Sequence, residues 1–169
     1  MHRVVAAISA LATILVAAMG IAAAQPKQVA TYQDWMVFTV QQGSDRICYA
    51  VTEPKDVSPV SANHGDVFFS VSTWRSGAAS NQPSFMAGYS LQTSSEPIVR
   101  VGSDRWEMFA EGKEGFIESE REEQRLIDAM RRGREMRVSA TSARSTATNY
   151  TFSLYGISKA LERVEQSCR

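Results

Sequence analysis

Apolar and polar side chains alternate most clearly in the last third of the chain. Residues 134–140 and 150–155 each place an apolar side chain at every second position. These side chains are Met136, Val138 and Ala140 in the first stretch and Tyr150, Phe152 and Leu154 in the second. A period of two residues is typical of a strand with one buried face. The pattern therefore predicts two strands joined by a turn rich in Ser and Thr.

The period changes after Gly156. Ile157, Leu161, Val164 and Cys168 are spaced four, three and four residues apart, which places them on one face of a helix. The pattern therefore predicts a C-terminal helix whose apolar face points the thiol of Cys168 at whatever the helix packs on.

Upstream of these elements, the pattern indicates short strands separated by turns. Strands are predicted at 31–40, 46–52, 66–74, 84–91, 97–101 and 105–110, and 53–65 is predicted to be a loop. One mid-chain helix is predicted from Ser119 to Arg132, because Ser119 and Glu122 form a capping box and Gly133 follows the last turn. The fold class indicated is mainly β, a sandwich or a barrel, with this helix and the C-terminal one at its periphery.

The first 24 residues have the composition of a secretory signal peptide. Arg3 precedes an uncharged apolar run that ends in the alanines 22–24, before Gln25. The alternative is a transmembrane anchor, since the run is just long enough to span a bilayer when tilted. The alanine content and the small residues at its end favour cleavage after Ala24. Residues 25–169 then form one domain that is periplasmic or secreted, without stable membrane insertion.

Both cysteines lie in the mature part of the chain, and two cysteines in an exported protein predict a disulfide bridge. In 46–52, Cys48 alternates with the bulkier apolar side chains Ile47, Tyr49 and Val51. If that bulkier side faces the core, Cys48 faces outward, where a surface helix carrying Cys168 covers it. In 31–40 apolar side chains occupy both sides, so we expect both to be covered.

Composition excludes several classes of function. The formal net charge is +0, which gives no reason to expect nucleic acid, an acidic substrate or an anionic membrane as partner. His64 is the one histidine after residue 24, and with two distant cysteines it does not make a zinc site, so no metal or cofactor is expected. The acidic residues within 118–123 are explained by the start of the predicted helix.

Two classes of function remain. A small periplasmic hydrolase would use His64 as its base, but the chain holds no G-x-S-x-G motif to accompany it. A non-catalytic binding protein needs only a stable scaffold that presents loops to a protein or glycan partner. The candidate contacts are Trp74 and Arg75 at the end of a strand and Arg144 in the Ser/Thr-rich turn. The sequence favours the binding class.

Several short motifs, taken in order, resemble the invasion-associated locus B family. They are Asp34-Trp35, Cys48-Tyr49-Ala50, the run FFSVSTW at 68–74, Thr141-Ser142-Ala143-Arg144, Tyr150, Ser153-Leu154-Tyr155-Gly156 and the final Cys168. The resemblance implies an immunoglobulin-like β-sandwich exported from a Gram-negative bacterium, in a family named for a link to host-cell invasion and without assigned catalytic residues. Some members carry a further cysteine where this chain has Thr39, so the disulfide pairing is argued from Cys48 and Cys168 alone.

The signal-peptide interpretation makes a direct prediction about the mature protein. After cell fractionation, N-terminal sequencing of the exported protein should begin at Gln25, because the small residues before it form the cleavage site. An intact Met1 on protein held in the inner membrane would identify the run as an anchor instead.

Overall fold

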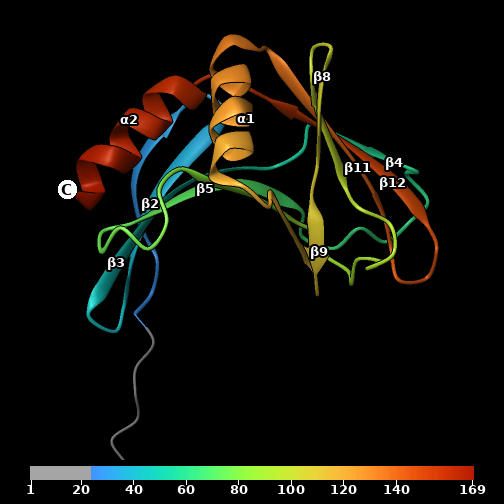
Figure 1. Ribbon diagram of the computed structural model, residues 1–169, viewed down its shortest axis with the longest axis horizontal. Coiled ribbons are helices and arrows are strands. Elements are labelled where there is room, and N and C mark those ends of the chain that lie inside the picture. The colour runs from blue at the N-terminus through green and yellow to red at the C-terminus, as the bar shows by residue number, and fades with distance from the viewer. Residues whose placement is uncertain (1–23) are drawn as a thin grey trace, which may run out of the picture.

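Two antiparallel β-sheets form the scaffold of the computed structural model, which describes residues 24–169 (Figure 1). The larger sheet, sheet A, has the strand order β1-β2-β3-β5-β6-β10-β9. Its strands are β1 Lys27–Tyr32, β2 Trp35–Gln42, β3 Asp45–Thr52, β5 Phe68–Trp74, β6 Gln82–Met86, β10 Glu114–Phe116 and β9 Phe109–Glu111. Neighbouring strands in the sheet are mostly neighbours in sequence, but β10 returns to lie beside β6.

The smaller sheet, sheet B, has the strand order β4-β12-β11-β7-β8. Its strands are β4 Asp56–Ser58, β12 Ala147–Ser153, β11 Glu135–Thr141, β7 Ile98–Val101 and β8 Asp104–Glu107. The pairing of β11 with β12 places Val138 opposite Tyr150, as the alternating pattern predicts. The turn between them is shorter than predicted, because the ladder continues to the pair Thr141 and Ala147.

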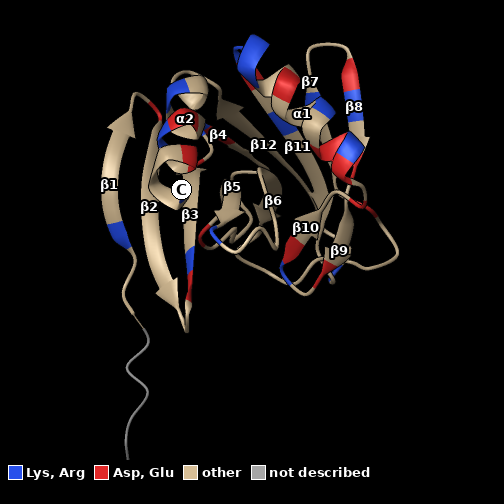
Figure 2. Cartoon of the chain, turned by 60° about the vertical axis from the view of Figure 1, so that its left-hand side comes forward, with Lys and Arg blue, Asp and Glu red and all other residues tan. Residues whose placement is uncertain are grey.

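Two helices complete the fold. Helix α1, Glu120–Arg132, begins at Ser119, whose hydroxyl accepts a hydrogen bond from the Glu122 backbone N–H at 3.4 Å, and it ends at Gly133. Helix α2, Ile157–Cys168, buries the four apolar side chains that share its predicted face. Helix α2 packs on β1, β2, β3 and β5 of sheet A, whereas α1 lies against β6, β7 and β8 (Figures 1 and 2). The predicted mainly β sandwich with a mid-chain and a C-terminal helix is confirmed, and the barrel is wrong because the sheets stay separate.

Aromatic side chains fill the space between the two sheets. Phe69 and Phe85 point inward from sheet A and meet Tyr150 and Phe152 of sheet B. Ring centroids lie 5.9 Å apart for Phe69 and Phe152 and 5.5 Å apart for Phe85 and Tyr150. These rings are at most 1% exposed, so this contact supplies a large share of the apolar burial that stabilises the fold.

The first predicted strand is two strands in the structure. β1 and β2 form a hairpin whose turn holds Gln33 at φ 54°, a left-handed conformation, so the predicted single strand at 31–40 is wrong. The predicted loop at 53–65 likewise contains the short edge strand β4. Both are cases where tertiary pairing, rather than local alternation, decides where a strand lies.

The Cys48–Cys168 disulfide is present, with the two Cα atoms 5.9 Å apart, and it links β3 to the end of α2. The helix that carries Cys168 covers Cys48, as expected, but the bulkier side of β3 does not face the core. Cys48 and Ala50 are fully buried on the side of sheet A that α2 covers, whereas Ile47, Tyr49 and Val51 face the opposite side and are partly exposed. Small side chains face the helix because its backbone must come close to the sheet.

Residues 1–23, which hold all but the last residue of the predicted signal peptide, lie outside the described part of the chain. Within residues 24–169, neither helix is long and apolar enough to cross a membrane.

Removal of the disulfide should destabilise the protein strongly. The bridge spans 120 residues of sequence, and in the chain-entropy model a loop of that size is worth about 4–5 kcal/mol, as an upper value. We expect the Cys48→Ala/Cys168→Ala variant to unfold at a much lower denaturant concentration than the oxidised protein, and the oxidised protein with reductant added to match it. Equal unfolding midpoints for all three samples, or two alkylatable thiols in the untreated protein, would contradict this assignment.

Candidate functional site

The outer face of sheet A, which points away from α2 and sheet B, is the candidate binding surface. It carries a hollow of about 460 Å³, which we call the outer trough. Its lining comes from five strands: Met36, Phe38, Tyr49, Val51, Phe68, Ser70, Ser72, Trp74, Gln82, Ser84, Met86, Glu114 and Phe116. A volume of this size is in the range of small-molecule and oligomeric ligand sites.

The trough exists because its centre is made of small side chains. Ser70 and Ser72 of β5 and Ser84 of β6 form the floor, and the Oγ atoms of Ser70 and Ser84 lie 3.0 Å apart in a hydrogen bond. In the sheet register, Ser70 lies between Val51 on β3 and Ser84 on β6. Larger side chains on the flanking strands therefore stand higher than the floor and form walls.

Aromatic rings make up much of these walls. Phe38 and Tyr49 are paired across β2 and β3, and their rings are stacked with centroids 5.5 Å apart and an interplanar angle of 15°. Phe116 of β10 pairs with Ser84 and forms the opposite wall. Burial raises the pKa of Tyr49 above its ordinary value of 10.0, so its phenol stays protonated and can donate a hydrogen bond.

Charge is almost absent from this face. β5 and β6 carry no charged residue, whereas charged residues gather on α1, α2 and β8 (Figure 2). Among the described residues that line the trough, Glu114 is the one with a charge, and none is basic. The expectation that both sides of the first strand are covered is wrong on this side, where Met36 and Phe38 remain partly exposed.

The three predicted contact residues do not lie on one surface. Trp74 lines the outer trough, at the end of β5. Arg75 lies in the exposed loop after it, where its backbone N–H donates to the carbonyl of Arg46 at 2.9 Å. Arg144 lines a different hollow beside the start of β5, where Ala62, Gly65 and Gly88 also lie. Trp74 and Arg144 are therefore not brought together.

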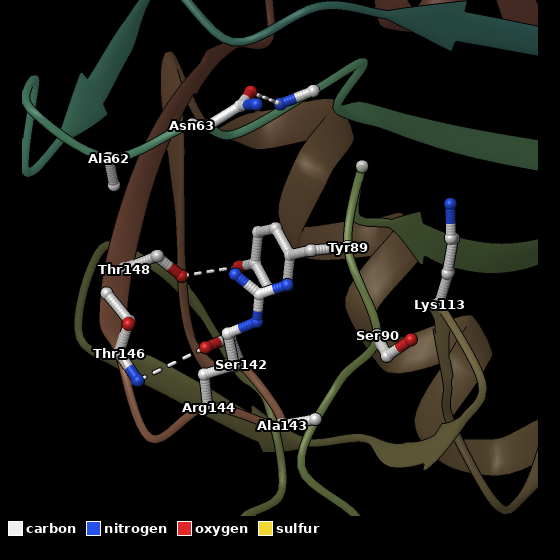
Figure 3. A pocket seen from close by; sticks show the side chains of 12 residues that line it. Ala62, Asn63, Tyr89, Ser90, Lys113, Ser142, Ala143, Arg144, Thr146 and Thr148 are labelled. Atoms are coloured by element: carbon white, nitrogen blue, oxygen red, sulfur yellow. Dashed lines mark hydrogen bonds between the residues drawn. The ribbon is translucent and has the colours of Figure 1, made fainter.

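The hollow that contains Arg144 is a polar cavity of about 610 Å³ (Figure 3). Its walls carry hydroxyl groups, among them Ser142, Thr146 and Thr148, and its two cations are Arg144 and Lys113. The Thr146 backbone N–H donates to the Ser142 hydroxyl at 3.1 Å and shapes the turn from which Arg144 extends (Figure 3). Both cations are exposed, so each stays well solvated.

His64 is held in a hydrogen-bonded network beside this cavity. Its Nδ1 lies 2.8 Å from the Tyr150 hydroxyl and its Nε2 lies 2.9 Å from the Pro59 carbonyl oxygen. The Tyr150 hydroxyl donates to Tyr89 at 2.9 Å, and burial together with this contact raises the pKa of Tyr150 well above 10.0. Within the described residues no serine or carboxylate hydrogen-bonds His64, so the geometry required of a hydrolase base is not formed there.

The other chemical groups have structural environments. Among residues 24–169 no group of three His, Cys, Asp or Glu side chains is arranged to hold a metal ion. Glu123, on the first turns of α1, is 9% exposed and hydrogen-bonds Gln82; burial, followed by the charge of Glu120, raises its pKa above 4.5. Glu122 instead pairs with Arg125 at 2.6 Å.

Two sequence motifs meet at the junction of the sheets. The Trp35 indole N–H donates to the Ser153 carbonyl at 3.0 Å, and the Ser153 hydroxyl donates to the Asp34 carboxylate at 2.6 Å. Lys55 pairs with the same carboxylate at 2.6 Å. Gly156 follows at φ 96°, where a Cβ would collide with the Tyr32 carbonyl oxygen. The motifs Asp34-Trp35 and Ser153–Gly156 therefore hold the sandwich together rather than form a reactive site.

Sequence reasoning missed the outer trough except for Trp74. The signal that could have found it is the alternation in 68–74, where Phe69 and Val71 point to one side and Ser70 and Ser72 to the other. A strand that places two serines on one side, between aromatic-rich strands, indicates a hollow on that side.

The structure defines a class of protein: a small β-sandwich whose C-terminal helix is fastened to the sheet by a disulfide. The chain belongs to the Invasion associated locus B (IalB) family, whose family model matches residues 35–165. That match covers most of the chain, from the start of β2 to residue 165 within α2, and it confirms the resemblance drawn from the motifs. Comparison with curated proteins and with solved structures finds no match.

Replacement of Asp34 by Asn should lower stability in a pH-dependent way. The hydrogen bond from Lys55, then that from Ser153, lowers the pKa of Asp34 below 3.8 in the folded protein. The ionised carboxylate therefore stabilises the fold above the unfolded-state pKa, and this contribution is lost as pH falls through the folded-state pKa. We expect Asp34→Asn to cost about 1 kcal/mol at pH 7 and progressively less below pH 4, by denaturant unfolding.

Asp66→Asn is the matched control, because Asp66 is exposed and forms no salt bridge within the described residues. A cost for Asp34→Asn that is the same at pH 7 and pH 3 would show that the carboxylate is not held in its charged form.

Proposed function

We propose that this IalB-family protein is an exported, non-catalytic binding protein of the cell envelope that takes its partner in the outer trough. The observation that carries the proposal is a 460 Å³ hollow on the face of sheet A that points away from α2 and sheet B, and that meets α1 where Glu123 hydrogen-bonds Gln82. Concave, aromatic-lined sites with a few polar groups are the usual form of a binding site. Export is supported by the composition of residues 1–24 and by the disulfide.

A binding role fits the chemistry of the trough better than a catalytic one. Catalysis needs a nucleophile or base with a partner that activates it, within hydrogen-bond reach. The floor hydroxyls of Ser70 and Ser84 hydrogen-bond each other, and no described residue of the trough is a histidine. His64, the base of the alternative hydrolase, has both ring nitrogens engaged by Tyr150 and Pro59.

The proposal moves the expected contacts from the loops to the strands. Trp74 is retained as a proposed contact, because it lines the trough at the end of β5. Its neighbours across the sheet, beginning with Ile47 on β3, are held in a regular ladder. Contacts on strands are less mobile than contacts on loops, so less conformational entropy is lost on binding. Arg75 and Arg144 remain candidates for separate contacts.

A side chain that fills the trough should abolish binding without unfolding the protein. Ser72 lies between Tyr49 and Gln82 in the register, on the partly exposed face, so Ser72→Phe occupies the floor and leaves the core unchanged. We expect at least tenfold weaker binding of purified oxidised protein to envelope vesicles or host-cell membranes, measured by co-sedimentation, with an unchanged unfolding midpoint.

Ser139→Phe is the matched control, because Ser139 lies half-buried on β11 in the other sheet and faces away from the core. It should bind as the wild type does. If Ser72→Phe and the wild type bind these membranes equally, or neither binds them, the proposed function fails.

A further inference from the structure

We propose that the occupant of the outer trough is a neutral oligosaccharide. This inference rests on the proposed binding function and names the ligand class for the same site. It is argued from three properties of the lining: the placement of rings and hydroxyls, the charge, and the hollow shape.

The lining offers a sugar both of the contacts that it needs. A pyranose ring has C–H groups on its faces, which pack against the electron-rich face of an aromatic ring, and hydroxyl groups around its edge, which need hydrogen-bond partners. The walls supply rings from both directions, with Phe38 and Tyr49 on one side and Phe116 on the other. The floor supplies the hydroxyls of Ser70 and Ser72 between them.

The floor also keeps hydrogen-bonding capacity free for a ligand. A serine hydroxyl has one donor and two acceptor lone pairs, so the Ser70–Ser84 pair uses one donor and one lone pair and leaves the rest. Adjacent strands lie about 4.8 Å apart and alternate residues about 7 Å apart along a strand. The floor positions Ser70 and Ser72 are therefore about 7 Å apart along β5, which lets each contact a different group of one ligand.

Charge excludes acidic ligands from the trough. Its described lining holds no Lys, Arg or His, and its one charged side chain is the carboxylate of Glu114. A sialylated, sulfated or phosphorylated chain would place an anion there without a counter-charge, at the cost of desolvation. Arg144 and Lys113 line the separate polar cavity. The lining therefore selects against anionic ligands.

Other occupants fit the lining less well. An acyl chain would cover the hydroxyl of Ser72, which has no hydrogen-bond partner among the described residues, and a buried unpaired hydroxyl costs roughly 1–3 kcal/mol, whereas Ser70 and Ser84 would keep their mutual hydrogen bond. A second copy of the chain, placed face to face, would set one hollow against the other. The empty space between them would deprive the lining of van der Waals contacts. A protruding protein loop remains as an outcome of the test.

A glycan array of neutral and acidic oligosaccharides, probed with the oxidised full-length mature protein, tests the ligand class. We expect binding to neutral chains only. Titration of the array's strongest neutral ligand should shift the tryptophan fluorescence saturably, because Trp74 lines the trough. Ser72→Phe should weaken this binding at least tenfold, and Ser139→Phe should leave it unchanged. No neutral binder on the array, preference for acidic chains, or equal binding by Ser72→Phe would overturn the inference.

Treatment of the membranes separates this inference from the proposed function. Periodate destroys vicinal diols of sugars and a protease destroys protein partners. If Ser72→Phe loses membrane binding and periodate abolishes wild-type binding while protease treatment does not, the glycan assignment holds. If Ser72→Phe loses binding but protease abolishes it and periodate has no effect, the trough binds a protein and only the glycan assignment fails.

Discussion

The aromatic contact between the sheets decides which side of sheet A faces the core. Phe69 and Phe85 can meet Tyr150 and Phe152 only if one side of β5 and β6 points inward. A strand has a period of two, so the residues between them point outward without further choice. The inward side of the sheet is then covered in turn by sheet B, α1 and α2, and the outward side is left to the trough.

Local periodicity predicted the elements whose burial is one-sided. The alternation in β11 and β12 and the helical spacing in α2 are reproduced because each presents a single apolar face to the core. At β3 the sequence left open which side faces the core, and the size of the side chains does not mark it. The helix that covers Cys48 needs small neighbours such as Ala50, so the bulkier Tyr49 lies on the partly exposed side. The turn at Gln33 was also missed. Its backbone has a positive φ, which usually marks a glycine, but this position holds Gln, so the sequence carries no glycine to indicate the turn.

The candidate site could be predicted only in fragments, because its parts come from five strands whose order is not the order of the chain. The serines of β5 were visible in the alternation at 68–74, and Trp74 was selected for its position. That Phe116 forms the opposite wall depends on β10 returning beside β6, a pairing over about thirty residues that no local pattern specifies. Arg144 was grouped with Trp74 because both are in or near loops, and only the sheet topology separates them.

The two faces of β5 have different roles, which explains how a hollow on one face is compatible with a stable small domain. Each inward residue of β5, such as Phe69, contributes to the core, while its outward neighbours Ser70 and Ser72 contribute little apolar burial. The outward positions can therefore change without loss of the packing that the fold requires. The disulfide acts on the inward side, where it holds α2 against β3, and it leaves the outward side unobstructed. The outer face of sheet A is held rigid by the core behind it, and the packing between the sheets constrains its side chains less than those of the inner face.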